Sequence, residues 1–185
     1  MKSGKYTYLF LVVTLVLGLA SCKKTTLQIE RDNEKVLLEK YINKYHKGIT
    51  PTASGLYYIE TKKGTGDSIV AGNYVKVFYN GYLIENNDTT GVRDGLKFDS
   101  SGDYEPFSFT VGSSSVIAGW DEAITHMRSG GEAKWIIPSK DAYAGRAQRT
   151  VPAYSTLVFY VKVYRVYRST DTLLTIQKVP RNILN

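Results

Sequence analysis

Residues 116–127 read VIAGWDEAITHM and place a short amphipathic segment in the middle of the chain. Four apolar side chains in it stand three or four positions apart, which is the spacing of one helical face: Trp120, Ala123, Ile124 and Met127. The serine triplet 113–115 offers an N-cap before the segment, and the glycine pair 130–131 favours an end after it. We therefore predict one short helix whose apolar face packs on a core.

Segments with the composition of strands surround this helix. They are rich in Val, Ile, Tyr and Phe and are bounded by turn-forming residues. They cover residues 56–62, 73–84, 107–111, 133–137 and 156–167. Several strands around one helix indicate an α+β domain in which the helix covers one face of an antiparallel sheet. Residues 85–92, ENNDTTGV, are predicted to form a polar loop.

A second helix is predicted before the domain, over residues 34–47. Its apolar stripe consists of Leu37, Leu38, Tyr41, Ile42 and Tyr45. Residues 25–33 are polar and without periodicity, so we predict a tether there, and Gly48 and Pro51 favour the end of the helix. A helix of about 14 residues is marginal alone. Two alternatives stay open for its stripe: packing on its own domain, or dimerisation.

The N-terminus has the pattern of an export signal. Lys2 and Lys5 precede an apolar run over residues 8–20, which is too short to span a bilayer comfortably. The run ends in Leu19-Ala20-Ser21-Cys22, which resembles the bacterial lipoprotein box. That resemblance implies a signal peptide over residues 1–21 and acylation of Cys22. An ordinary signal peptide with an incidental cysteine is the alternative.

A lipidated Cys22 implies a protein of the bacterial cell envelope, held to the membrane by its lipid anchor. By the sorting rule of enterobacteria, Lys23 in place of Asp implies the outer membrane, facing the periplasm. The chain carries a formal net charge of +7. Because an exported chain meets no nucleic acid, we interpret this charge as a solvated basic surface beside anionic lipid.

Several classes of chemistry are excluded by composition and motifs. One cysteine allows no intramolecular disulfide, and two histidines, His46 and His126, are too few and too far apart for a Cys/His metal cluster. No phosphate-binding glycine loop and no serine-hydrolase elbow is present. We expect no metal and no cofactor.

Six motifs occur together and in order. They are VFYNG at 77–81, DGLKFDSS at 94–101, PFSF at 106–109, VIAGWDEA at 116–123, AY at 142–143 and TLVF at 156–159. As an ordered set they resemble the FKBP family of peptidyl-prolyl isomerases over residues 55–167. The resemblance implies a bent antiparallel sheet wrapped around a short helix. Residues 22–54 then form a tether and helical extension, and residues 168–185 a C-terminal extension.

The resemblance also implies an activity, which is cis/trans rotation about the bond before proline. Amide conjugation gives that bond a barrier of roughly 18–20 kcal/mol. Because no bond breaks, the reaction needs no nucleophile, base or metal. A water-poor aromatic pocket favours the less polar twisted state over the planar one.

Nine residues match the family's site. Trp120 is expected to form the floor beneath the proline ring, while the Ile117 N–H and the Tyr143 hydroxyl hold substrate carbonyls. The implied catalytic residues are Tyr79, Phe98, Asp99, Trp120 and Tyr143. The implied substrate-binding residues are Phe107, Val116, Ile117 and Phe159. The structural alternative is plain core packing for the aromatic rings, and capping of the Ser100 turn for Asp99.

Two segments depart from the family pattern. Residues 85–92 look like an insertion of about six residues, which we expect to project as a solvated loop. Residues 144–151 replace a loop that contacts substrate, and Arg146 and Arg149 there are expected to alter substrate preference.

The implied partners are proline-containing unfolded or extended polypeptides, with macrolides such as tacrolimus and rapamycin as inhibitors. A different function stays open as an alternative. It is a non-catalytic chaperone, or an adaptor module, that uses the same cleft without rotating a bond.

Overall fold

The computed structural model describes residues 25–87 and 89–168. The predicted signal peptide, the lipid site at Cys22 and most of the predicted C-terminal extension lie outside the described residues. Within the described part of the chain, no helix is both long enough and apolar enough to cross a membrane.

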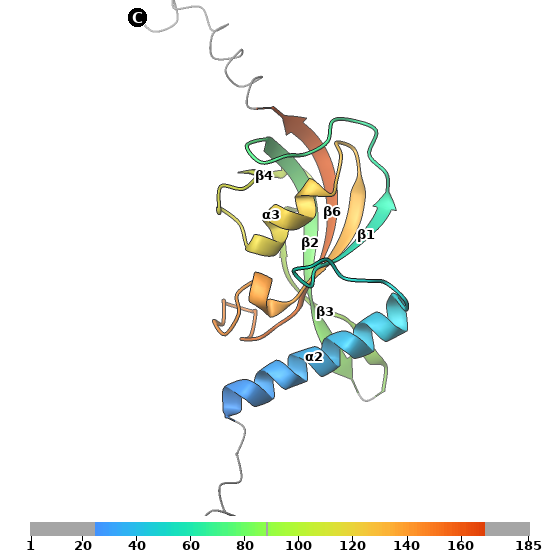
Figure 1. Ribbon diagram of the computed structural model, residues 1–185, viewed down its shortest axis with the longest axis vertical. Helices are drawn as coiled ribbons and strands as arrows, with labels where there is room; N and C mark the ends of the chain where they lie inside the picture. The colour runs from blue at the N-terminus through green and yellow to red at the C-terminus, as the bar shows by residue number, and fades with distance from the viewer. Residues whose placement is uncertain (1–24, 88, 169–185) are drawn as a thin grey trace, which may run out of the picture.

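One antiparallel sheet forms the domain, and it bends around a short helix (Figure 1). The strands are β1 (Tyr57–Lys62), β2 (Tyr74–Asn87), β3 (Gly91–Ser100), β4 (Phe107–Thr110), β5 (Glu132–Ile137) and β6 (Leu157–Tyr167). The strand order is β1-β5-β6-β2-β3, and β4 pairs with β2. The helix α3 (Ala118–Thr125) covers the inner face of the sheet. The predicted fold class is confirmed.

Strand alternation divides the apolar residues between two cores. On β6, Leu157, Phe159 and Val161 point to the inner core with α3, whereas Val158 points to the outer face. On β5, Trp135 belongs to the inner core in the same way, and Ile136 to the outer one. Strands β5 and β6 are therefore buried on both faces around residues 135–136 and 157–159.

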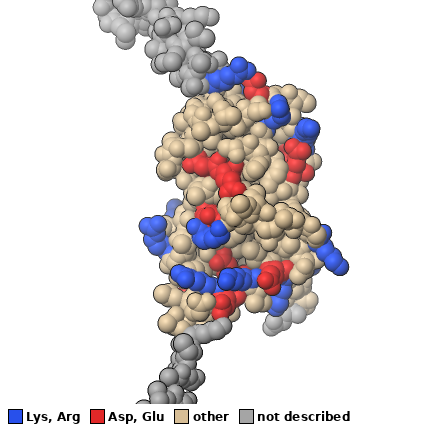
Figure 2. All heavy atoms as spheres, viewed as in Figure 1, with Lys and Arg blue, Asp and Glu red and all other residues tan. Residues whose placement is uncertain are grey.

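The outer core exists because a second helix covers it. This helix, α2 (Thr26–Tyr45), crosses the end of the domain beside the β2–β3 hairpin (Figure 1). Tyr41 is fully buried and Ile42 nearly so, and they pack with Ile84, Val92, Ile136 and Val158. Of the two alternatives for the apolar stripe, the structure has packing on the helix's own domain. The solvent face of α2 carries interspersed basic and acidic side chains (Figure 2).

The tether predicted over residues 25–33 is wrong, because α2 already begins at Thr26. Thr25 is its N-cap, and the Thr25 side chain accepts a hydrogen bond from the Gln28 amide at 3.3 Å. This first half of the helix lacks an apolar stripe. Contacts of Arg31 and Glu34 with the domain hold it instead, and such contacts leave no apolar periodicity in the sequence.

The polar loop predicted over residues 85–92 is also wrong. β2 continues to Asn87 and β3 begins at Gly91, with Glu85 paired to Arg93 and Asn86 to Val92. An ion pair of 3.2 Å joins Glu85 to Arg93. One face of this hairpin is covered by α2, which buries Val92. The other face is open to solvent and can carry polar residues, so a polar sequence is compatible with paired strands here.

The serine triplet does not cap α3. Ile117 is the N-cap and makes no side-chain cap bond. The Ser113 hydroxyl donates instead to the Thr110 carbonyl at 2.7 Å, in the turn after β4. Asp121, in the first turn of α3, accepts from the Gly112 amide at 2.8 Å and ties this turn to the helix.

Candidate functional site

A cavity of about 190 Å³ opens on the inner side of the sheet, next to the start of α3. Its walls come from β2, β3, β4, β6, the residues before α3, and the segment after β5. The lining residues are Tyr79, Phe98, Asp99, Phe107, Ser115, Val116, Ile117, Trp120, Tyr143 and Phe159. The structure thus brings all nine predicted site residues together around one cavity. Their catalytic roles stay predictions.

Trp120 forms the floor of this cavity. Its side chain is only 4% exposed, and its ring stands edge to face against those of Tyr79 and Phe159, at centroid distances of 4.9 and 5.1 Å. Gly119 sets this position, because a Cβ there would collide with the side chain of Ile137 on β5. The helix therefore begins close against the sheet with its indole under the cavity.

A second glycine lets two wall rings meet. Gly81 on β2 pairs with Asp99 on β3 and with Phe159 on β6. A Cβ at position 81 would lie 2.8 Å from ring atoms of both Phe98 and Phe159. These rings stand 5.6 Å apart and edge to face across the glycine. The missing side chain therefore makes room for the apolar wall.

The polar side of the cavity is built around Asp99. Its carboxylate accepts a hydrogen bond from the Tyr79 hydroxyl at 2.7 Å and another from the Ser100 amide at 2.8 Å. The capping alternative and the cavity position therefore both hold for this residue. Burial, followed by the hydrogen bond to Asp99, raises the pKa of Tyr79. The Tyr79 phenol stays a proton donor at neutral pH.

Tyr143 lines the same cavity and lies on the segment that follows β5. Burial and then the negative charge of Asp99 raise the pKa of the Tyr143 phenol. Among the described residues its hydroxyl has no hydrogen-bond partner, so its proton is available to a ligand. A protonated phenol that lines a cavity can donate to a carbonyl oxygen of a ligand.

Ser115 is the one lining residue that the sequence reasoning missed. Its position directly before Val116 is the signal in the sequence that could have identified it. Neither Arg146 nor Arg149 lines the cavity. The expected effect of these arginines on substrate preference stays a prediction.

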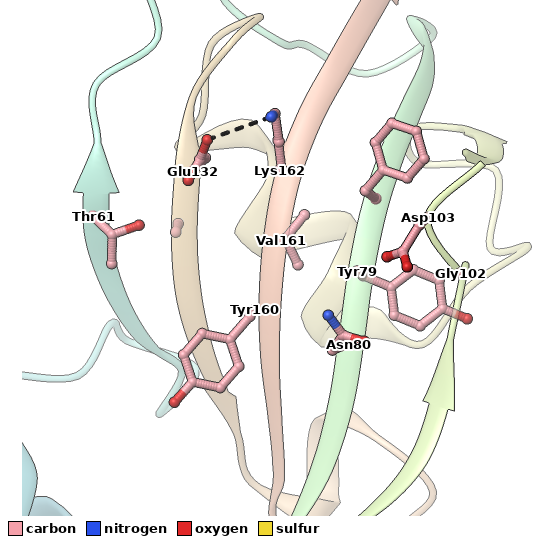
Figure 3. Close-up of a pocket in the computed structure, with 11 residues that line it drawn as sticks. Thr61, Tyr79, Asn80, Gly102, Asp103, Glu132, Tyr160, Val161 and Lys162 are labelled. Atoms are coloured by element: carbon pink, nitrogen blue, oxygen red, sulfur yellow. Dashed lines mark ion pairs between the residues drawn. The ribbon is translucent and has the colours of Figure 1, made fainter. Parts of the chain in front are cut away.

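A second hollow, of about 390 Å³, lies over β5, β6 and β2 (Figure 3). Its lining includes Phe78, Asn80, Tyr160 and the Lys162–Glu132 ion pair, whose charged atoms are 3.8 Å apart. The aromatic residues in its lining are Phe78, Tyr79 and Tyr160, and the lining contains no tryptophan. A charged lining of this kind suits the planar, polar amide better than the twisted one, so the Trp120 cavity is the stronger candidate site.

No group of three or more His, Cys, Asp or Glu side chains within residues 25–87 and 89–168 could hold a metal ion.

Comparisons with known proteins support the family resemblance that the six sequence motifs indicate. A family model described as FKBP-type peptidyl-prolyl cis-trans isomerase matches residues 66–164. The chain is 35% identical to an FKBP-type peptidyl-prolyl cis-trans isomerase FkpA of Aeromonas hydrophila, over 80% of this chain and 50% of that protein. It is 36% identical to an FK506-binding protein of Neisseria meningitidis serogroup B, over 61% of this chain and 97% of that one.

The fold has solved counterparts as well. The crystal structure of a peptidyl-prolyl cis-trans isomerase from Pseudomonas syringae pv. tomato superposes with a TM-score of 0.63 and 26% identity. The match covers 79% of this chain and 99% of that structure. The chain spans only half the length of the Aeromonas relative.

Proposed function

Because the chain belongs to the FKBP-type peptidyl-prolyl cis-trans isomerase family, we propose that it accelerates rotation about Xaa-Pro bonds in exported polypeptides, with the proline ring seated on Trp120. One observation carries the proposal. A ring-lined cavity has a buried indole as its floor and two phenols and a carboxylate on its polar side.

The proposed mechanism relies on differential binding of the twisted amide. The rings around Trp120 exclude water, so the planar amide loses solvation that stabilises its polar resonance form. The Tyr143 phenol is free to hold a substrate carbonyl, and Tyr79 fixes the orientation of Asp99. Lowering the barrier by about 5.4 kcal/mol corresponds to a rate increase of roughly 10⁴.

A protease-coupled assay with a proline tetrapeptide tests this function. We expect clear acceleration by the wild type and its loss in a Trp120→Ala, Asp99→Ala double variant. Tyr104→Ala is the control, because Tyr104 is 97% exposed and lies outside the cavity. Wild-type activity no higher than that of the double variant contradicts the proposal. Suppressed aggregation of a proline-free unfolded client, retained in the double variant, would then favour the chaperone alternative.

Tacrolimus, which is FK506, is the proposed inhibitor, because the macrolide would occupy the same cavity. The name of the Neisseria relative, FK506-binding protein, supports this. Calorimetric titration should show binding by the wild type and its loss in Trp120→Ala. If the wild type is an active isomerase that does not bind tacrolimus, the altered segment 144–151 becomes the first residue range to exchange.

We also propose that Cys22 carries lipid and holds the domain at the bacterial envelope, at the outer membrane facing the periplasm. The apolar run 8–20 and the Leu19-Ala20-Ser21-Cys22 box support this. Labelled palmitate should enter the wild type and not a Cys22→Ser variant, which should leave the membrane fraction. Equal labelling of both proteins contradicts the lipid site.

A further inference from the structure

The carboxylate of Glu34 on α2 ties together the two ends of the segment that carries Tyr143. It accepts hydrogen bonds from the Ser139 amide at 2.7 Å, from the Ser139 hydroxyl at 2.6 Å and from the Thr156 hydroxyl at 2.8 Å. Ser139 and Thr156 are each only 4% exposed. Ser139 begins the segment after β5, and Thr156 immediately precedes β6. One half-buried carboxylate therefore holds both ends of the segment together.

Ser139 links Glu34 to the backbone on either side of Tyr143. Its carbonyl oxygen accepts hydrogen bonds from the amides of Ala142 and Ala144, at 2.9 and 2.7 Å. These two residues flank Tyr143 directly. Ser139 is thus held by Glu34 through its amide and hydroxyl, while its carbonyl holds the backbone on both sides of the cavity phenol. Hydrogen bonds to a carboxylate are stronger than those between neutral groups. The bonds from Ser139 to Glu34 are therefore stronger than those from Ala142 and Ala144 to the Ser139 carbonyl.

A second contact from α2 holds the far side of the same segment. The guanidinium of Arg31 lies over the ring of Tyr154, 5.3 Å from its centroid. The Tyr154 amide donates to the Ala144 carbonyl at 2.8 Å. Ala144 and Tyr154 both have positive φ, of 51° and 54°. Side-chain-bearing residues hold this conformation where surrounding contacts support it, and the Arg31 contact to Tyr154 is one such contact.

We propose that Glu34 is a positioning residue for the isomerase site: through Ser139 it places the Tyr143 hydroxyl at the cavity. Glu34 and Arg31 lie before the region that the family model matches, residues 66–164. The N-terminal helix is therefore part of the machinery that shapes the site. This inference rests on the proposed function for its effect on rate, but its effect on Tyr143 is structural and is measurable separately.

A double-mutant cycle tests the effect on rate. We expect Glu34→Ala to lower kcat/KM about tenfold, since displacement of one positioned group has effects of this order or larger. In a Tyr143→Phe background the same substitution should have little further effect, because the hydroxyl it positions is already absent. Glu39→Ala is the matched control: the same residue type is exposed on the same helix. A purely structural loss would lower both backgrounds equally and would overturn the proposal.

Amide hydrogen exchange tests the positional claim without any assay of activity. In Glu34→Ala the amides of Ala142 and Ala144 should exchange faster, while those in the centre of β6 keep their protection. Unchanged exchange at these two amides overturns the proposal even in an active enzyme. An inactive wild type overturns the proposed function instead, and faster exchange at Ala142 and Ala144 would still support the link from Glu34 to the Tyr143 backbone.

Discussion

Tyr79 joins the floor of the cavity to its polar wall. Its ring stands at 88° to the indole of Trp120 with centroids 4.9 Å apart, and its hydroxyl donates to Asp99 at 2.7 Å. One side chain of β2 therefore contacts the apolar floor and also orients the nearby carboxylate. The two functions of Tyr79 are separable, because phenylalanine keeps the ring and loses the hydroxyl.

Tyr79→Phe should therefore lower activity more than stability. Asp99 keeps the Ser100 amide and loses the phenol, so its carboxylate is less well oriented. We expect kcat/KM to fall about fivefold to tenfold, and the free energy of unfolding to fall by about 1 kcal/mol, the typical net value of one hydrogen bond. Tyr82→Phe is the control, since Tyr82 lies on the same strand and packs with the outer core. Equal effects of the two substitutions contradict this role of Tyr79.

Gly81→Ala should narrow the cavity. The added methyl would lie 2.8 Å from both Phe98 and Phe159, so at least one ring must move. We expect a loss of about 1–3 kcal/mol in the free energy of unfolding, as for overpacked cores, together with weaker tacrolimus binding. Phe98→Leu in the same chain should restore part of the lost stability, because it removes one of the two clashing rings. Wild-type binding and stability in Gly81→Ala would contradict the geometry.

Periodicity and composition predicted most strands of the sheet and the short helix, whereas the nine residues around the cavity followed from the resemblance of the six motifs to a known family. The cavity residues could be found because the motifs that carry them are contiguous, such as Phe98-Asp99 and Val116-Ile117. The β2–β3 extension was missed because it has one buried side chain, Val92, among polar neighbours. Its pairing depends on the cover that α2 provides.

The start of α2 and the anchor at Glu34 were missed for a related reason. Glu34 and Ser139 are 105 positions apart, and neither has a sequence neighbourhood that indicates the other. Contacts between the half-buried Glu34 carboxylate and a distant loop follow from tertiary packing, and local propensity carries no information on them. The site could therefore be predicted as a set of lining residues, without the helix that supports it.

The polar cluster beneath α2 provides a prediction for stability. Lys134 is only 7% exposed. Its ammonium donates to the Tyr41 hydroxyl at 2.6 Å and lies 3.8 Å from the Asp94 carboxylate. The Tyr41 hydroxyl in turn donates to Asp94. Tyr41→Phe should cost about 1–3 kcal/mol in urea unfolding, because it leaves buried polar groups short of a partner.

Tyr45→Phe is the matched control for this cluster. Tyr45 is 45% exposed, and its hydroxyl donates only to the Val92 carbonyl at 3.0 Å among the residues described. Water can replace that partner, so the cost should be smaller than for Tyr41→Phe. A loss for Tyr45→Phe as large as that for Tyr41→Phe would show that the buried cluster has no special contribution.

Stability should also fall on mild acidification because of His46, which ends α2. Burial, followed by the positive charge of Lys134, lowers the pKa of this imidazole, while Asp94 acts weakly in the opposite direction. The unfolded chain, with an ordinary pKa near 6.5, therefore takes up the proton first. The contribution of neutral His46 is present above this pH and is lost as the pH falls through 6.5 toward the folded value.

Urea unfolding at pH 7.5 and pH 5.5 should show a smaller decrease in the free energy of unfolding for His46→Gln than for the wild type. His126→Gln, at the exposed end of α3, controls for the loss of one histidine. The same decrease in all three proteins would mean that other groups cause it.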